Sequence, residues 1–183
     1  MSSDYGVEWG SLRTLNGVGM DPAPIGVMLS APDSKTANEA YWGIEGTAFY
    51  SRYLEEAALP VTRVLVDAVC DGECTYWGMV LATDALVELT YECHSARPEL
   101  DGLDLPDRCR AVVRAHLPRL YQMLDETTDD TVLSNLITIV CNVEDDTPTR
   151  RALLEKLSHR DLDVLSADEV SRQLAKEHQR QEK

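Results

Sequence analysis

Residues 75–93 read TYWGMVLATDALVELTYEC and carry the strongest helical pattern in the chain. Their apolar side chains recur every three or four positions, as they do along one face of an α-helix. The stripe comprises Trp77, Val80, Leu81, Ala85, Leu86, Leu89 and Cys93. A stripe this wide predicts a helix that is covered on two sides, so the fold should be built from other helices packed around it.

The same spacing continues on both sides of that segment, and the alternation typical of strands is absent. The helical spacing also extends through residues 49–57. Asp33 or Ser34 is expected to cap one helix, and Asp107 another. Because proline disrupts a helix interior, Pro118 should kink or split the helix that Asp107 begins.

Short helices joined by turns of Pro, Gly and Asp are typical of an α-solenoid, although a closed bundle has the same periodicity. A weak internal repeat favours the solenoid. Residues 60–69 and 117–124 each combine a proline at a helix start or kink, a basic residue soon after it and an apolar stripe, and an acidic turn follows each of them. At the other end of the chain, residues 166–169 (SADE) have the spacing of a capping box and should open a final, polar helix.

The first half of the chain also carries a set of short motifs. These are WGSL at 9–12, Pro24, LS at 29–30, WGIEGTAF at 42–49 and ALP at 58–60. With them, residues 9–90 resemble the opening of small bacterial HEAT-like repeat proteins, in which a Gly-Thr-x-aromatic turn precedes a helix that starts at proline. The resemblance implies an α-solenoid that serves as a scaffold for protein binding. It implies no enzymatic activity, and several such scaffolds act as inhibitors or immunity proteins of bacterial toxins.

These observations together predict an all-α fold, a short right-handed α-solenoid of HEAT-like helical pairs. Residues 1–165 should form the helical repeat domain, and residues 166–183 a polar C-terminal helix. Trp9, Trp42 and Trp77 lie among apolar neighbours at helical spacing, so we expect them in the core, although exposed Trp side chains also anchor interfaces.

The negative charge of the chain is concentrated in its middle. The 183 residues have a net charge of −15, and residues 66–146 alone hold five Arg or Lys and seventeen Asp or Glu, a net charge of −12. A field of one sign repels nucleic acid and anionic lipid, and it accelerates encounters with a basic partner. We therefore expect a protein partner, with no nucleic acid and no membrane. The oligomeric state stays open.

The acidic residues fall into a loop at 95–107 and into the turns around residues 125–130 and 144–146. We expect the partner-binding residues among them: Glu99, Asp101, Asp104, Asp107, Asp125, Glu126, Asp129, Asp130, Glu144, Asp145 and Asp146. Because the two turns flank one helix, they should form two clusters at its opposite ends. The alternative is that this charge only keeps the protein soluble.

Motifs for catalysis are missing from the sequence. It contains no Gly-rich phosphate loop and no Gly-x-Ser-x-Gly. Cys70 and Cys74 could hold a soft metal, but a single pair with this spacer is a poor zinc signature. Asp84, Glu88 and Glu92 share one helix face, yet carboxylate metal sites usually add a histidine from a facing helix. We expect no catalytic residues, no metal and no cofactor.

The five cysteines cannot all pair within one chain, and residues 1–9 lack the apolar core of a secretory signal. The apolar stretch at 76–89 is too short to span a bilayer. A cytoplasmic protein with reduced thiols is therefore expected.

Two functions fit this description. The first is a protein-binding inhibitor, an immunity protein that neutralises a basic bacterial toxin, including one that attacks nucleic acid. The alternative is a structural adaptor in a larger assembly, which would bind through the concave face of the solenoid and not through the acidic residues.

Overall fold

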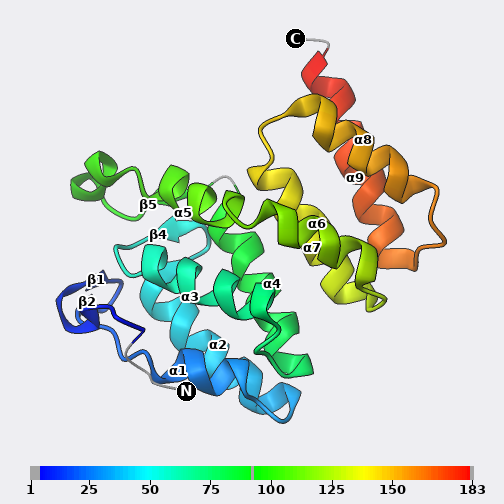
Figure 1. Ribbon diagram of the computed structural model, residues 1–183. Helices are drawn as coiled ribbons and strands as arrows, with labels where there is room; N and C mark the ends of the chain where they lie inside the picture. Colours follow the sequence, from blue (N-terminus) through cyan, green and yellow to red (C-terminus); the bar gives the residue numbers. More distant parts are fainter. Residues whose placement is uncertain (1–4, 92, 182–183) are drawn as a thin grey trace.

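The computed structural model describes residues 5–91 and 93–181 and shows a mostly helical chain with two small sheets (Figure 1). The α-helices of the described residues are α1 (Ala23–Leu29), α2 (Ser34–Ala48), α3 (Ala58–Asp71), α4 (Tyr76–Thr90), α5 (Leu105–Arg114), α6 (Leu117–Glu126), α7 (Asp130–Val143), α8 (Thr147–Ser158) and α9 (Val164–Gln181). The 3-10 helices are Trp9–Ser11 and Pro98–Leu103. The strands, each of two residues, are β1 (Arg13–Thr14), β2 (Gly17–Val18), β3 (Phe49–Tyr50), β4 (Tyr53–Leu54) and β5 (His94–Ser95).

The small sheets correct the expectation of an all-α fold. β1 pairs antiparallel with β2, and β3 pairs antiparallel with β4, which in turn lies parallel to β5. The β3–β4 hairpin lies within residues 49–57, where the apolar spacing had indicated helix. Its two turn residues, Ser51 and Arg52, have φ of 48° and 73°, as the tightest hairpin turns require. Two consecutive left-handed residues end any helix, so the apolar spacing is misleading here.

α4 is the helix that the sequence placed at residues 75–93, and it lies at the centre of the fold. It packs against α1, α2, α3, α5 and α7. The Thr75 side chain caps it by accepting from the Gly78 N–H, and the helix ends at Thr90, before Cys93. Ala82, Ala85, Leu86 and Leu89 are fully buried in it. The prediction of a helix that is covered on two sides is confirmed.

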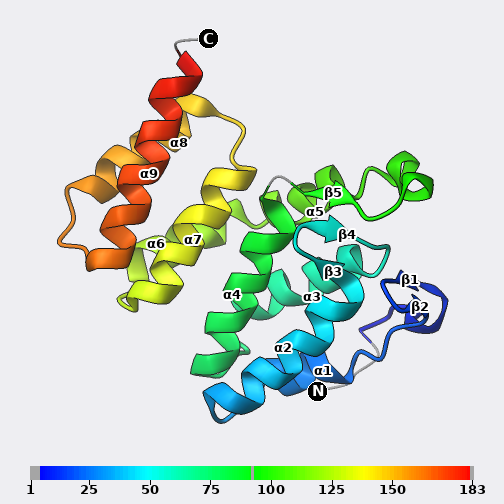
Figure 2. The same ribbon diagram turned by 180° about the vertical axis from the view of Figure 1, so that it is seen from behind.

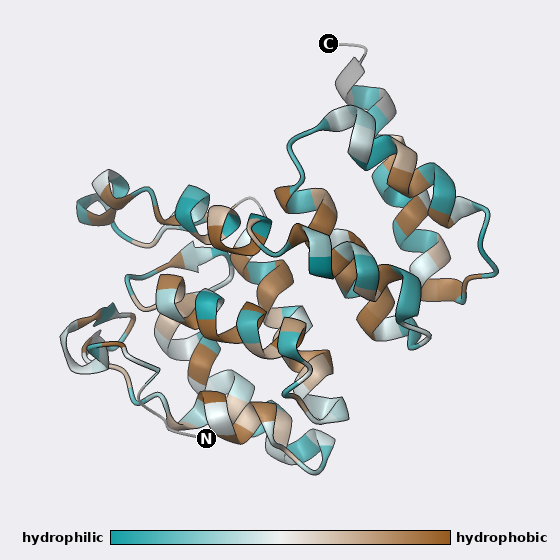
Figure 3. Ribbon diagram, viewed as in Figure 1, coloured by the Kyte–Doolittle hydropathy of each residue, from teal (hydrophilic) through white to brown (hydrophobic). Residues whose placement is uncertain are grey.

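The helices lie in two layers. α2, α4, α7 and α9 contact one another in that order, and Figure 2 shows them following one another across the near side of the molecule. α3, α6 and α8 pack behind them, against α4, α7 and α9 respectively. In Figure 3 hydrophobic residues are frequent on α3, α4 and α7, whereas α8 and the connecting loops are largely hydrophilic. The core therefore lies between the layers, and it thins toward the C-terminal helices.

Two hydrogen bonds set the register of α4 and α7. Asn135 donates from Nδ2 to Thr83 Oγ1 at 3.1 Å, and Asn142 donates in the same way to Thr90 Oγ1 at 3.2 Å. The bonded residues are seven positions apart on both helices, so the helices run parallel and meet along one seam. A shift by one turn would break both bonds at once.

The helix boundaries confirm some sequence expectations and correct others. α5 ends at Arg114 and α6 begins at Leu117, so the chain is split at Pro118 as expected. Asp107 does not cap, because α5 already begins at Leu105. The capping box at 166–169 is also wrong, since α9 begins at Val164. Among the described residues, no helix is long and apolar enough to cross a membrane.

Candidate functional site

The two acidic turns lie at opposite ends of α7, as expected from the sequence. Residues 125–130 join α6 to α7, and residues 144–146 join α7 to α8. The acidic loop before α5 forms the second 3-10 helix and projects from the body of the molecule beside β5 (Figure 1). The structure thus separates the eleven predicted residues into three groups.

Asp129 and Asp130 accept hydrogen bonds from backbone N–H groups at the N-termini of two helices. Asp129 caps α7 by accepting from the Val132 N–H at 2.9 Å, and it also accepts from the Tyr76 hydroxyl at 3.0 Å. Asp130 acts on α9, because its carboxylate accepts from the backbone N–H groups of Leu165 and Ser166, both at 2.9 Å. An anion at this point also offsets the positive end of the helix dipole. These two carboxylates therefore hold the helix ends together.

Asp130 gives a prediction about stability and pH. Burial tends to raise the pKa of Asp130, but hydrogen bonds from Ser166 and Leu165 outweigh burial and hold this pKa below its usual range. The stabilisation is then complete above the pKa of the unfolded chain, about 3.9, and is lost as the pH falls through the lower folded-state pKa. We expect Asp130→Ala to lower the free energy of unfolding by about 1–2 kcal/mol at pH 7, and by less below pH 4.

Denaturant unfolding at several pH values checks this, with Asp168→Ala on the exposed side of α9 as the control, expected to stay within about 0.5 kcal/mol of the parent. A loss for Asp130→Ala that is the same at pH 7 and at pH 3.5 would contradict the assigned role.

Three further acids of the two turns form ion pairs. Asp125 lies 2.7 Å from Lys156 Nζ, and Glu126 lies 3.1 Å from an Arg119 nitrogen. Asp145 pairs with Arg114 Nη2 at 2.8 Å. Of the remaining two, Glu144 accepts from the Tyr121 hydroxyl, and Asp146 accepts from the Thr149 hydroxyl. Most of the charge in the acidic turns is therefore engaged within the chain.

The acidic loop differs from the turns. Asp107 pairs with Arg110, which lowers the pKa of its carboxyl through a hydrogen bond and charge attraction. Glu99, Asp101 and Asp104 are exposed, and within the described residues none of them is ion-paired with a basic side chain. The loop thus presents three uncompensated negative charges away from the core.

A fourth acidic group, which was not among the predicted partner-binding residues, lies between α2 and α4. The Tyr41 hydroxyl donates to Asp84, and burial and then this carboxylate raise the pKa of Tyr41. Burial raises the pKa of Asp84 itself. The pKa of Glu45 is raised by burial, then by Glu88 and Asp84. Sequence spacing identified Asp84 and Glu88 as one helix face, but the contribution of α2 depends on how α2 packs against α4.

The three tryptophans differ in burial, and two of them lie on α2 and α4, beside this acidic group. Trp9 is buried as expected, whereas Trp42 on α2 is 63% exposed, so its expected place in the core is wrong. The Trp42 ring packs edge-on against Tyr41, with centroids 5.8 Å apart. Trp77 on α4 is partly exposed.

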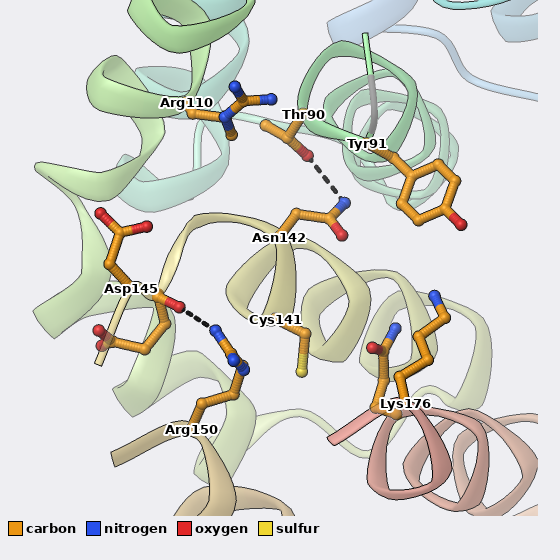
Figure 4. Close-up of a pocket in the computed structure, with 10 residues that line it drawn as sticks. Thr90, Tyr91, Arg110, Cys141, Asn142, Asp145, Arg150 and Lys176 are labelled. Carbon is orange, nitrogen blue, oxygen red and sulfur yellow. Dashed lines mark hydrogen bonds between the residues drawn. The ribbon is translucent and has the colours of Figure 1, made fainter. Parts of the chain in front are cut away.

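A polar cavity of about 300 Å³ lies where the C-terminal ends of α4 and α7 meet α5, α8 and α9 (Figure 4). Its lining consists of Thr90, Tyr91, Arg110, Cys141, Asn142, Glu144, Asp145, Arg150, Gln173 and Lys176. Arg150 donates from Nε to Glu177 at 2.7 Å and from Nη1 to the Glu144 carbonyl. Lys176 lies over the Tyr91 ring, 4.8 Å from its centroid. The Arg150 contacts tie the loop that follows α7 to α9, so this guanidinium is a structural link.

The five cysteines and the acidic clusters are the remaining candidates for reactive or metal-binding groups. All five cysteines are free thiols. Burial raises the pKa of Cys141 to about 12 despite nearby Arg150, so this thiol stays protonated and unreactive at neutral pH. Among the described residues, no group of three or more His, Cys, Asp or Glu could hold a metal ion. Glu92, the third member of the predicted carboxylate stripe, lies outside the described residues.

Comparisons with protein-family models, with curated proteins and with solved structures found no match.

Proposed function

We propose that this chain is a protein-binding inhibitor, an immunity protein that neutralises a basic bacterial toxin. The observation that carries the proposal is the projecting loop of residues 98–107. Its carboxylates at Glu99, Asp101 and Asp104 are exposed and form no ion pair with any described basic side chain, while those of the two turns are mostly engaged. Uncompensated charge on a protruding loop accelerates the encounter with an oppositely charged partner.

The architecture that we propose for this function is a short HEAT-like α-solenoid. The ordered contacts of α2, α4, α7 and α9, each backed by a second helix or helix pair, support it. Such a stack offers one long, continuous face to a partner. The five free thiols support a cytoplasmic location.

The test is growth rescue. Proteins encoded beside this chain are expressed alone and together with it, and a toxic basic neighbour should become harmless in its presence. The charge-reversed loop, with Glu99→Lys, Asp101→Lys and Asp104→Lys combined, should associate with that neighbour about tenfold more slowly at low salt. Reversal of Glu155, Asp161 and Asp168, exposed acids on and near α8 and α9, is the control. No rescue and no binding by any neighbour would refute the proposal.

A structural adaptor remains the second candidate, favoured by apolar side chains exposed outside the acidic loop. Val164 and Leu165 at the start of α9 are 83% and 54% exposed. An adaptor that binds there should tolerate the loop reversals and fail when both residues become serine. The opposite pattern would favour the inhibitor.

A further inference from the structure

One face of α4 is left uncovered between α2 and α7. The residues Trp77, Leu81, Asp84 and Glu88 follow one another at spacings of three or four, and all are partly exposed. In Figure 2, α4 lies between α2 and α7 on the near side of the molecule. Together with Trp42 and Glu45 of α2, these four residues form what we call the α2–α4 face. Its α4 stripe begins apolar and ends acidic.

The fully buried acids of the described residues each have a basic partner, unlike the partly exposed carboxylates of this face. Glu55 pairs with Arg97 at 2.7 Å, Glu177 pairs with Arg150 at 2.7 Å, and Glu169 pairs with Arg172. Within the described residues, no ion pair joins a basic side chain to any carboxylate of the α2–α4 face.

Leaving these carboxylates unpaired has a cost inside the chain. Asp84 and Glu88 are four residues apart on one helix, an arrangement of like charges that destabilises it. Burial raises the pKa of Glu45, and the negative charges of Glu88 and Asp84 raise it further. A basic side chain brought by another molecule would relieve this repulsion, and nothing within the described chain does so.

Trp42 gives the α2–α4 face an exposed apolar side chain that a partner could pack against, in addition to the carboxylates. The residue is 63% exposed, and its ring lies edge-on against Tyr41, whose hydroxyl donates to Asp84. Exposed Trp side chains dominate many protein interfaces, and an indole face also attracts guanidinium groups. Tyr41 therefore contacts both the Trp42 ring and the Asp84 carboxylate.

We propose that the α2–α4 face is the docking surface for a basic segment of a partner protein, with Trp42 as the apolar anchor and Glu45, Asp84 and Glu88 receiving its Arg or Lys side chains. This rests on the proposed function and names the surface that it uses. The acidic loop then accelerates the encounter, and the α2–α4 face holds the bound partner.

The test uses a defined probe, so that it does not depend on finding the natural partner. The peptide acetyl-Arg-Gly-Arg-Gly-Arg-amide is titrated into the isotope-labelled full chain, and the indole N–H signal of Trp42 is followed by NMR. The same peptide with citrulline in place of arginine is the uncharged control. We expect a saturable shift with the arginine peptide only.

Variants locate the binding. Glu45→Gln, Asp84→Asn and Glu88→Gln combined should weaken peptide binding about tenfold or more. A control variant with the same net charge carries Glu155→Gln, Asp161→Asn and Asp168→Asn, and it should bind as the parent does. Both variants are first checked for an unchanged or raised melting temperature, because removing unpaired, mutually repelling carboxylates should not cost stability.

Several results would overturn the inference. They are an unmoved Trp42 signal, equal weakening by both triple variants, a shift caused by calcium chloride but not by the peptide, or shifts confined to residues 98–107. The last result would leave the proposed function standing with the loop as its surface. Failure of growth rescue with a normal peptide titration would instead refute the immunity role and keep the docking surface.

Discussion

Replacing Gly78 with alanine should destabilise the protein by about 3 kcal/mol, at the upper end of overpacking substitutions. A Cβ at this position would lie 2.3 Å from the Leu29 carbonyl oxygen and within 3 Å of two other backbone atoms of Leu29. Backbone atoms cannot rotate away as a flexible side chain can, so α1 and α4 would have to separate. Thr75 holds the same junction, since its N–H donates to the Leu29 carbonyl at 2.9 Å.

Gly46→Ala is the matched control. Gly46 lies within α2, and a Cβ there would meet nothing within 4 Å. Alanine should therefore stabilise α2 by up to about 1 kcal/mol, through its higher helix propensity. Thermal unfolding of both variants measures the contrast, which should amount to roughly 10 °C. If the two variants have equal melting temperatures, the close packing of α1 on α4 is wrong.

Replacing Arg150 with methionine should have an effect of similar or greater size. The side chains of Arg150 and Glu177 are 8% and 4% exposed, so the ion pair between α8 and α9 is buried. Removing one member of a buried pair costs about 3–5 kcal/mol, because the remaining charge loses its counterion away from water. The polar cavity of Figure 4 should also lose the link between the loop after α7 and α9.

Lys156→Met is the control for Arg150→Met. Lys156 pairs with Asp125 at the surface, where an ion pair is worth about 1 kcal/mol or less. The double variant Arg150→Met, Glu177→Met should recover much of the lost stability, because it removes both charges together. Chemical denaturation at pH 7 measures the free energy of unfolding of all three variants. Equal losses for Arg150→Met and Lys156→Met would show that the buried pair is not a structural link.

The sequence predicted the helices well where a local signal specifies them. The apolar stripe of α4, the split at Pro118 and the cap at Asp33 all depend on residues close together in the chain. The β3–β4 hairpin was missed because its apolar residues also fit helical spacing. Only the left-handed backbone of its turn, which no Gly or Asn marks, ends the helical pattern.

The candidate surface was predicted only in part. The charge distribution locates an acidic region in the sequence, but it could not tell which carboxylates are engaged by other groups of the folded chain. Asp130 is an example, since it caps a helix that begins 34 residues later in the chain. Glu45 and Trp42 were missed as surface residues because their exposure depends on how α2 packs against α4. Gly78 was missed for the same reason, because a close helix contact leaves no trace in the spacing of apolar residues.

We propose that an uncompensated acidic surface of this chain receives a basic protein. The most direct test is the association rate constant between this chain and whichever basic neighbour the growth-rescue experiment identifies, measured from low to high salt. We expect a rate that falls about tenfold or more as salt screens the charges, with a further loss of affinity in Trp42→Ala. A rate that does not change with salt, or binding that survives both the loop reversals and Trp42→Ala, would contradict it.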